Sequence, residues 1–273
     1  MGENQEQFGR RLATLFVMVG VAVGLGNVWR FPYMMGAYGG GTFLFIYILA
    51  MCVFGIPALV AEWALGRETG EGPPGALVKA GLPGGRIVGS ALFITVIMAL
   101  SYYAVVIGWV LLYLVRAITT GLQGADPATV FETTIHGFAG QTIATWIVLS
   151  GCAVVILAGV KKGIERVSRI FIPVFFVLLI GLMIRSLTLP GASAGIRYLI
   201  TFDVNAITGR TFLAVVGQVF FSMALGGTFM VTYGSYLRKD VRPVPLAIQT
   251  ATGDLLAAVL AAFLVIPAVF AAG

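Results

Sequence analysis

Long stretches without a charged residue restrict how this chain can fold more than any other feature. A helix needs roughly 20 apolar residues to cross the ~30 Å hydrocarbon core of a bilayer, and most of these stretches reach that length. We therefore predict seven transmembrane helices. The uncharged stretches cover residues 12–29, 31–61, 87–115, 137–160, 170–184, 211–237 and 255–273.

The composition also places the chain in a membrane. Of its 273 residues, 59% are hydrophobic and only 10% are charged, values that exclude a soluble globular domain. With a cytoplasmic N-terminus, twelve of the 17 Lys and Arg residues fall in inner loops and four in outer ones, as the positive-inside rule requires. We expect a multi-pass protein of the cell membrane with its N-terminus in the cytoplasm. The net charge of +6 follows from this topology and does not indicate a nucleic-acid partner.

The first predicted span carries three glycines within residues 20–26, followed by Asn27, Arg30 and Pro32. Backbone groups left unpaired in lipid cost several kcal/mol each, so an interrupted helix is tolerated only where it is packed in protein or lines a cavity. Carbonyl groups freed by the interruption can bind a cation, and the amide end of the next half-helix can bind a carboxylate. The segment predicts a site near the middle of the membrane for a small anionic solute and a coupling ion.

The sixth predicted span, residues 211–237, contains Gly226-Gly227 and so carries a second interruption signal. It lies five helices after the first and crosses the membrane in the opposite direction, which is typical of an inverted repeat with a site at its interface. Close packing of glycine-bearing helices is the alternative explanation for either signal alone. We expect one transmembrane domain over residues 1–273, in which 12–187 form the first five-helix repeat and 211–273 form the first two helices of a second, incomplete repeat.

Five polar side chains within the predicted spans are candidates for the site. Asn27 offers the amide oxygen that hard cations prefer, and Asp254 needs a cation, a proton or a donor beside it. Glu62 can accept hydrogen bonds from amides freed at an interruption, Tyr103 can reach a carboxylate, and Arg30 is costly within a span unless it has a function. The alternatives are an interhelical hydrogen bond for Asn27, a snorkelling side chain for Arg30 and aromatic packing for Tyr103.

Other classes of protein fit the sequence less well. An enzyme needs a nucleophile and a base within reach of each other, but His136 falls alone in an outer loop, and the spans hold neither an HExxH motif nor paired aspartates. A channel would require a repeated filter sequence. We expect neither an enzyme nor a bound cofactor, and we expect Cys52 and Cys152 to be buried and unpaired within their spans.

The residues resemble those of the neurotransmitter:sodium symporter family, whose members have the LeuT-type fold and roughly twice this length. The resemblance implies an all-α polytopic membrane protein, truncated after its seventh transmembrane helix, with helices one and six broken mid-membrane. It rests on motifs that follow one another along the whole chain: Gly24-Leu25-Gly26-Asn27-Val28-Trp29-Arg30-Phe31-Pro32, Gly39-Gly40-Gly41, Pro57, Glu62-Trp63, Gly66-Arg67, Tyr102-Tyr103, Lys162-Gly163-Ile164-Glu165-Arg166, Gly217-Gln218-Val219-Phe220-Phe221-Ser222 and Tyr233-Gly234-Ser235-Tyr236.

The resemblance further implies two binding sites for sodium as the coupling ion, and it leaves chloride dependence open. Backbone carbonyl groups at the first interruption would contribute to both sites. The ligand that the family takes from its seventh span corresponds to Gly253, and Asp254 beside it is the candidate here. The implied ligands are Ala22, Asn27, Ser222 and Asp254 for the first site, and Gly20 and Val23 for the second.

The substrate that the resemblance implies is an amino acid. Family members that transport biogenic amines carry an aspartate at the position of Gly24, whereas glycine leaves room for the substrate's own carboxylate. Ala224 and Gly227 remove bulk from the pocket, which favours a large apolar or aromatic substrate. The implied pocket residues are Ala22, Gly24, Leu25, Gly26, Tyr103, Phe221, Ser222, Ala224 and Gly227.

Gates are implied on either side of this pocket. Arg30 would form part of the outer gate. At the inner gate, the arginine and tryptophan of the family are replaced by Gln5 and Phe8, whereas Ser235 and Tyr236 are retained.

The function that the resemblance implies is sodium-coupled symport of an amino acid by alternating access. The partners are the amino acid, sodium and the lipid bilayer, and the sequence does not indicate an oligomeric state. The second hypothesis is a truncated product that does not transport, because an incomplete core would leave the polar interruptions without partners in lipid.

Overall fold

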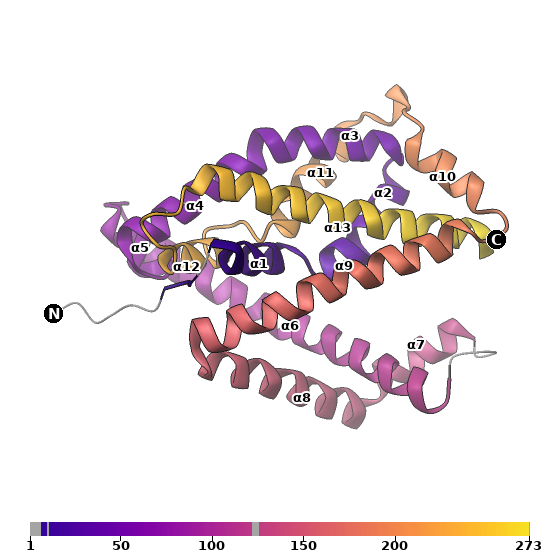
Figure 1. Cartoon of the computed structure of the whole chain (residues 1–273), viewed down its shortest axis with the longest axis horizontal. Helices are drawn as coiled ribbons and strands as arrows, with labels where there is room; N and C mark the ends of the chain where they lie inside the picture. The colour runs from indigo at the N-terminus through magenta and orange to yellow at the C-terminus, as the bar shows by residue number, and fades with distance from the viewer. Residues whose placement is uncertain (1–6, 10, 122–125, 273) are drawn as a thin grey trace.

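A computed structural model describes residues 7–9, 11–121 and 126–272 of the chain. All regular structure within these residues is helical, which confirms the predicted all-α class. Most of the long helices run along the long axis of the molecule (Figure 1). The α-helices are α1 (Arg11–Ala22), α2 (Phe31–Ala37), α3 (Gly41–Ala50), α4 (Ile56–Thr69), α5 (Pro73–Lys79), α6 (Gly85–Thr119), α7 (Pro127–His136), α8 (Phe138–Leu157), α9 (Arg166–Leu187), α10 (Ala192–Ile200), α11 (Gly209–Ser222), α12 (Phe229–Ser235) and α13 (Pro243–Ala272).

Short helical turns of other types join several of these helices. The π-helical turn η2 connects α3 to α4 without a break, and η3 leads directly into α9. The first join produces one long helix from α3 and α4, each of which would be too short to cross a membrane alone, and the second lengthens α9. The turns are η1 (Gly26–Arg30), η2 (Met51–Gly55), η3 (Val160–Glu165) and the 3-10 turn η4 (Val204–Ala206).

Six of the seven predicted spans are long and apolar enough to cross a membrane. One of them consists of α1 followed by η1 and α2, which are bent by 50° at a short break. The prediction for residues 211–237 differs in form, because α11 and α12 have only 14 and 7 residues and are separated by residues 223–228. The continuous spans are Gly41–Thr69, Gly85–Thr119, Phe138–Leu157, Val160–Leu187 and Pro243–Ala272.

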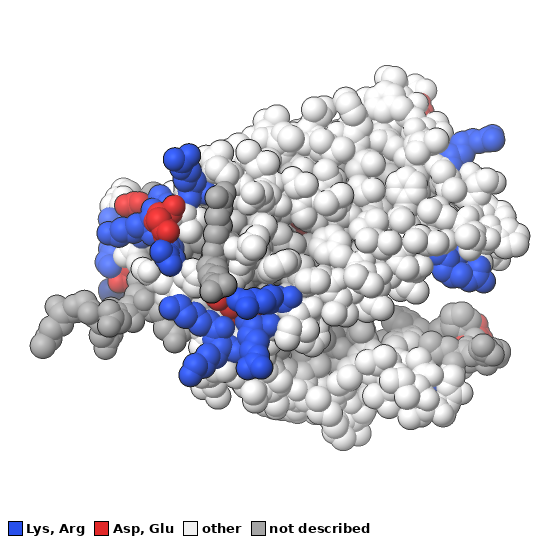
Figure 2. Space-filling model, viewed as in Figure 1, with Lys and Arg blue, Asp and Glu red and all other residues white. Residues whose placement is uncertain are grey.

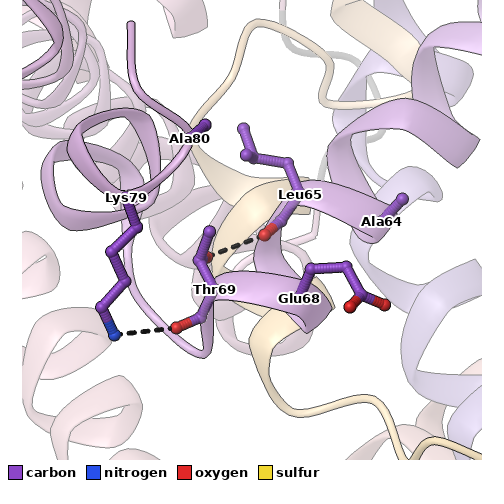
Figure 3. Close-up of a pocket in the computed structure, with 6 residues that line it drawn as sticks. All are labelled: Ala64, Leu65, Glu68, Thr69, Lys79 and Ala80. Atoms are coloured by element: carbon purple, nitrogen blue, oxygen red, sulfur yellow. Dashed lines mark hydrogen bonds between the residues drawn. The ribbon is translucent and has the colours of Figure 1, made fainter.

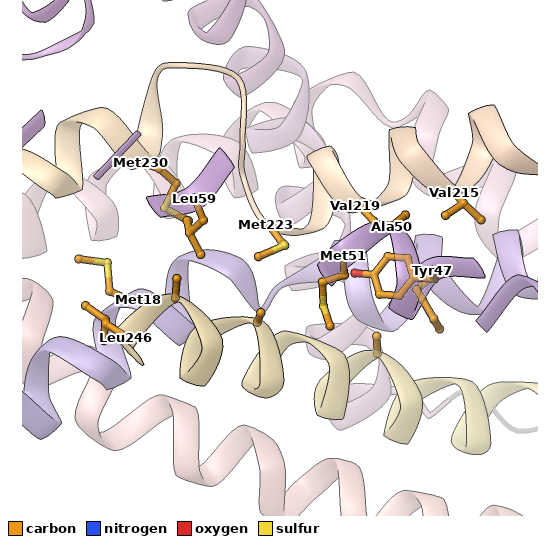
Figure 4. Close-up of a cluster of buried hydrophobic side chains, with 14 of the residues drawn as sticks. Met18, Tyr47, Ala50, Met51, Leu59, Val215, Val219, Met223, Met230 and Leu246 are labelled. Atoms are coloured by element: carbon orange, nitrogen blue, oxygen red, sulfur yellow. The ribbon is translucent and has the colours of Figure 1, made fainter. Parts of the chain in front are cut away.

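Helix α13 forms the centre of the packing, in contact with α1, α2, α4, α9 and α10. Its buried face consists largely of small side chains, which let neighbouring helices approach closely. Larger side chains from α1, α3, α4, α11 and α12 fill the space beside it (Figure 4). The small residues are Ala247, Ala251, Ala258 and Ala262, and the larger ones include Met18, Tyr47, Leu59, Val219, Met223 and Met230.

Helices α6 and α8 pack against each other along one edge of the molecule (Figure 1). Large apolar side chains on their outer faces are exposed, as expected for helices that face lipid. Cys52 and Cys152 are also exposed and unpaired. The prediction that both cysteines are buried is therefore wrong, because a thiol is apolar enough to face lipid rather than the protein core.

Residues 191–195 read Gly-Ala-Ser-Ala-Gly, which is the spacing of a hydrolase nucleophile motif. That motif requires a sharp turn from a strand into a helix. Here the segment follows α9 and forms the start of α10. The segment therefore lacks the local structure that exposes a catalytic serine.

Close approach of α4 and α12 depends on Gly66. A Cβ atom at Gly66 would collide with the Val231 carbonyl oxygen and lie 2.9 Å from the Ser235 nitrogen. We expect the G66A variant to lower the free energy of unfolding by about 1–3 kcal/mol. G151A is the matched control, since nothing lies within 4 Å of a Cβ at Gly151. Thermal unfolding in detergent measures both, and an unchanged midpoint for G66A would contradict this packing.

Candidate functional site

The first helix interruption is held by the side chain of its own asparagine. Helix α1 ends at Ala22, after which the Gly24 N–H donates to Asn27 Oδ1 at 3.0 Å. The Asn27 N–H donates to the Gly24 carbonyl at 3.1 Å. The side chain thus replaces the backbone bond that Gly24 would make in a continuous helix. Carbonyl groups that accept no hydrogen bond from the described residues include those of Gly20, Ala22 and Val23.

The second interruption is held by a carboxylate from α4. Gly226 and Gly227 have φ angles of 135° and 76°, which glycine adopts without steric cost. Their N–H groups donate to Glu62 Oε1 at 2.8 and 2.9 Å. Glu62 therefore satisfies two amides that the broken helix leaves without carbonyl partners.

A buried cluster of four polar side chains joins the two interruptions. Asp254 Oδ1 on α13 accepts from Asn27 Nδ2 at 2.7 Å and from Ser222 Oγ at 2.6 Å. Asp254 Oδ2 accepts from the Tyr47 hydroxyl of α3 at 2.9 Å. Asn27 Nδ2 also lies 3.2 Å from Ser222 Oγ and 3.1 Å from the Asp254 carbonyl oxygen. All four residues are at most 3% exposed, so the cluster is closed to bulk water.

The charge of Asp254 has no counter-ion in the described part of the chain. Its carboxylate contacts three neutral donors, and the ion pairs among described residues lie elsewhere. Burying an ionised carboxylate among neutral groups is costly, so this one requires either a proton or a cation. Carboxylate and hydroxyl oxygens suit a hard cation, and the Asn27 amide, which here directs its nitrogen at the carboxylate and its oxygen at the Gly24 N–H, would supply that oxygen only after turning over. The chemistry of the cluster therefore fits a sodium ion.

Tyr103 on α6 faces the first interruption. Its hydroxyl lies 3.5 Å from where a Cβ on Gly24 would be, and the Leu25 N–H is directed at it. The neighbouring Tyr102 is 63% exposed and points away from the protein interior. The Tyr103 hydroxyl and the Leu25 amide are thus two hydrogen-bonding groups close to Gly24, which has no side chain.

Phe221 and Gly227 bring the second interruption to the same region. A Cβ on Gly26 would lie 2.8 Å from the Phe221 ring, so this ring covers the first interruption. A Cβ on Gly227 would lie 3.4 Å from Leu92 of α6, and Ala224 has a positive φ of 51° within the break. Residues predicted for the pocket therefore come from both interruptions, and the second interruption lies beside α6.

Arg30 lies at the end of η1, beside α11. Its Nη1 donates to Gln218 Oε1, and its guanidinium carbon lies 4.7 Å from the centroid of the Phe221 ring. This contact is a cation–π interaction. Arg30 therefore connects the second half of the first broken helix to the first half of the other.

Two of the residues predicted for the inner gate, Phe8 and Tyr236, are in contact beside α12. The Phe8 N–H donates to the Tyr236 carbonyl at 3.1 Å, and the two rings pack edge to face at 6.1 Å. The Ser235 hydroxyl donates to the Thr232 carbonyl at 2.7 Å, within α12. Gln5 lies outside the described residues.

A hollow of about 620 Å³ lies between the end of α4 and α5 (Figure 3). Lys79 Nζ donates there to the Thr69 carbonyl at 3.0 Å and pairs with Glu71 Oε1 at 2.8 Å. Because none of the predicted site residues lines this hollow, we do not assign the site to it. The lining residues are Ala64, Leu65, Glu68, Thr69, Lys79 and Ala80.

Two residues of the site were not predicted. Tyr47 stands in an apolar stretch, where aromatic packing explains it equally well, so its bond to Asp254 follows only from the fold. Gln218 is the only amide side chain within residues 211–237. That isolation is a signal that could have identified Gln218 as a buried hydrogen-bonding partner.

A scan of known families matches this chain to the model described as the sodium:neurotransmitter symporter family, over residues 5–135 and 128–272. The uncharacterized sodium-dependent transporter YhdH of Bacillus subtilis (strain 168) is 35% identical, over 98% of this chain and 60% of the relative. The sodium-dependent neutral amino acid transporter B(0)AT2 of Bos taurus is 29% identical, over 84% of this chain and 36% of the relative.

Among solved structures, the crystal structure of MhsT in complex with L-phenylalanine is similar over 99% of this chain and 62% of that one. The sequence identity is 36% and the TM-score is 0.91. The chain therefore has the LeuT-type fold that the motifs predicted. It spans 50–62% of the length of three sodium-dependent transporters from prokaryotes to which it is similar.

Removal of the Tyr47 hydroxyl would leave one oxygen of the buried Asp254 carboxylate without a donor. We expect Y47F to lower the free energy of unfolding by about 1–3 kcal/mol. Y33F is the matched control, because Tyr33 on α2 is 69% exposed. Equal thermal stability of the Y47F variant and the wild type would show that the carboxylate does not depend on this hydroxyl.

Proposed function

The chain belongs to the sodium:neurotransmitter symporter family, and from this membership we propose that it performs sodium-coupled symport of an amino acid by alternating access. The observation that carries the proposal is the buried Asp254 carboxylate, which joins both helix interruptions without a counter-ion. A coupling ion at this point would stabilise the arrangement of both interruptions together. The ion would thereby favour the conformation that is ready to bind substrate.

In the proposed first sodium site, Asp254 supplies the negative charge. Asn27 and Ser222 already contact this carboxylate, and the Ala22 carbonyl lacks a donor from the described residues. The carbonyl groups of Gly20 and Val23, which also accept no hydrogen bond from the described residues, contribute to a second site. Free carbonyl oxygens at a broken helix are suitable ligands for sodium.

The proposed pocket holds the amino acid between the interruptions and α6. The Leu25 and Gly26 amides and the Tyr103 hydroxyl would bind the substrate carboxylate, since Gly24 has no side chain of its own and the Tyr103 hydroxyl faces it. The carbonyl groups of Ala22, Phe221 and Ser222 would bind the amino group. Small residues at 224 and 227 leave room for a large apolar or aromatic side chain, and the similar MhsT structure contains L-phenylalanine.

The proposed gates lie on either side of this pocket. Arg30, tied to α11 and resting on Phe221, would close the outer side. Phe8 and Tyr236, with Ser235 beside them, would close the inner side. We place the N-terminus in the cytoplasm, because most Lys and Arg residues lie at that end. Residues 12–187 and 211–273 would then belong to two inverted repeats.

Equilibrium binding of labelled L-phenylalanine to the purified chain tests the proposal. We expect binding in sodium chloride and none in potassium chloride, with unlabelled aromatic and large apolar amino acids competing better than glycine or alanine. Equal affinity for L-phenylalanine with and without sodium, or a preference for the smallest amino acids, would contradict the proposal. Sodium-dependent binding without uptake into proteoliposomes would instead support the second hypothesis, a truncated product that does not transport.

Two adjacent tyrosines provide a matched test of the carboxylate subsite. We expect Y103F to weaken L-phenylalanine binding by about tenfold, the loss of one hydrogen bond to a charged group. Y102F should bind as the wild type does, because Tyr102 faces away from the pocket. The result would be contradicted by equal affinities for the two variants in the same binding measurement.

A further inference from the structure

Four exposed cations lie together where α8 turns into α9. Lys161 and Lys162 belong to η3, and Arg166 and Arg169 belong to the first turn of α9. Figure 2 shows Lys and Arg side chains gathered at this end of the molecule. Lys162, Arg166 and Arg169 follow at spacings of four and three residues, which places them on one face of the helix, where like charges repel one another.

The nearest acid does not neutralise these cations. Glu165 is buried, and its Oε1 accepts a hydrogen bond from the Gly9 N–H. Its carboxylate is therefore directed into the protein, toward the N-terminal segment. None of the four cations forms an ion pair within the described part of the chain.

The other carboxylates near this end are already paired. Glu68 lies 3.5 Å from an Arg67 nitrogen, and Asp240 accepts from Arg238 at 2.9 Å. Glu71 is paired with a lysine in the same way. The four cations at residues 161–169 therefore form a group of positive charges that has no counter-ion among the described residues.

The surface beside the cluster is apolar. Leu157, at the end of α8, is 86% exposed, and Ile156 is 65% exposed. On the other side, Ile170 and Phe171 of α9 are 56% and 66% exposed. A ligand that meets both surfaces needs an anionic group attached to an apolar chain.

We propose that the cluster of Lys161, Lys162, Arg166 and Arg169 binds the phosphate headgroup of an anionic phospholipid whose acyl chains lie against α8 and α9. Basic residues next to a membrane-spanning helix attract anionic lipids, and Arg binds phosphate oxygens through paired hydrogen bonds. The lipid would relieve the repulsion on this face and hold the turn between α8 and α9 at the membrane surface. This site is separate from the proposed substrate pocket.

Native mass spectrometry of the purified chain tests the proposal with phosphatidylglycerol and phosphatidylcholine of identical acyl chains. We expect tighter binding of phosphatidylglycerol, by about tenfold or more. The K162Q/R166Q/R169Q variant should lose this preference, and K162R/R166K/R169K should keep it. The matched control is R185Q/R197Q/R210Q, which removes three exposed arginines elsewhere and should also keep it. Wild-type binding without a preference, or a preference that survives the glutamine substitutions, would overturn the proposal.

Two further arms separate the lipid from other anions. Inorganic phosphate at the same concentration should fail to displace phosphatidylglycerol, and equal displacement would mean that the cluster binds free anions instead.

Glu3 and Glu6 lie outside the described residues. If the preference appears only in the E3Q/E6Q variant, the cluster is occupied by the chain's own acids and the proposal is overturned. Thermal unfolding of each variant identifies any that do not fold, and the single variants R166Q and R169Q then replace the triple one.

Discussion

The buried carboxylate of Asp254 is the interaction on which the arrangement of this chain depends. It receives hydrogen bonds from the first interrupted helix, from the end of α11 and from α3, so three elements far apart in the sequence converge on one charged group. In a membrane interior, this arrangement is stable only with a proton or a cation beside the carboxylate. The structure thus ties both interruptions to one buried carboxylate, and whatever neutralises that carboxylate acts on both of them.

The interruptions themselves need partners, since unpaired backbone groups are not tolerated in lipid. Asn27 supplies them at the first break and Glu62 at the second. Close approach of helices makes the second arrangement possible: Gly66 lets α12 lie against α4, the same helix that carries Glu62. The polar groups at the breaks and the glycines in the surrounding helices therefore act together.

Much of the fold and of the site could be predicted from the sequence. Long apolar stretches indicate membrane helices, and glycines flanked by polar residues indicate interruptions. Asn27, Glu62 and Asp254 were predicted to be important since an amide or a carboxylate in a span is costly. Their partners were harder to identify: Tyr47 became part of the site only through a contact between α3 and α13. The exposure of Cys52 could not be read from its apolar surroundings, since lipid and protein core select the same residues.

The most direct test of the central claim is the thermal midpoint of the chain in sodium chloride against potassium chloride. An ion that binds only the folded state stabilises it by about 2.7 kcal/mol at one hundred times its dissociation constant. The account predicts that sodium raises the midpoint of the wild type and of D240N, which removes an exposed carboxylate, by more than that of D254N, which retains only the proposed second site. A sodium-dependent increase in D254N equal to that of the wild type would show that the buried carboxylate is not an ion ligand.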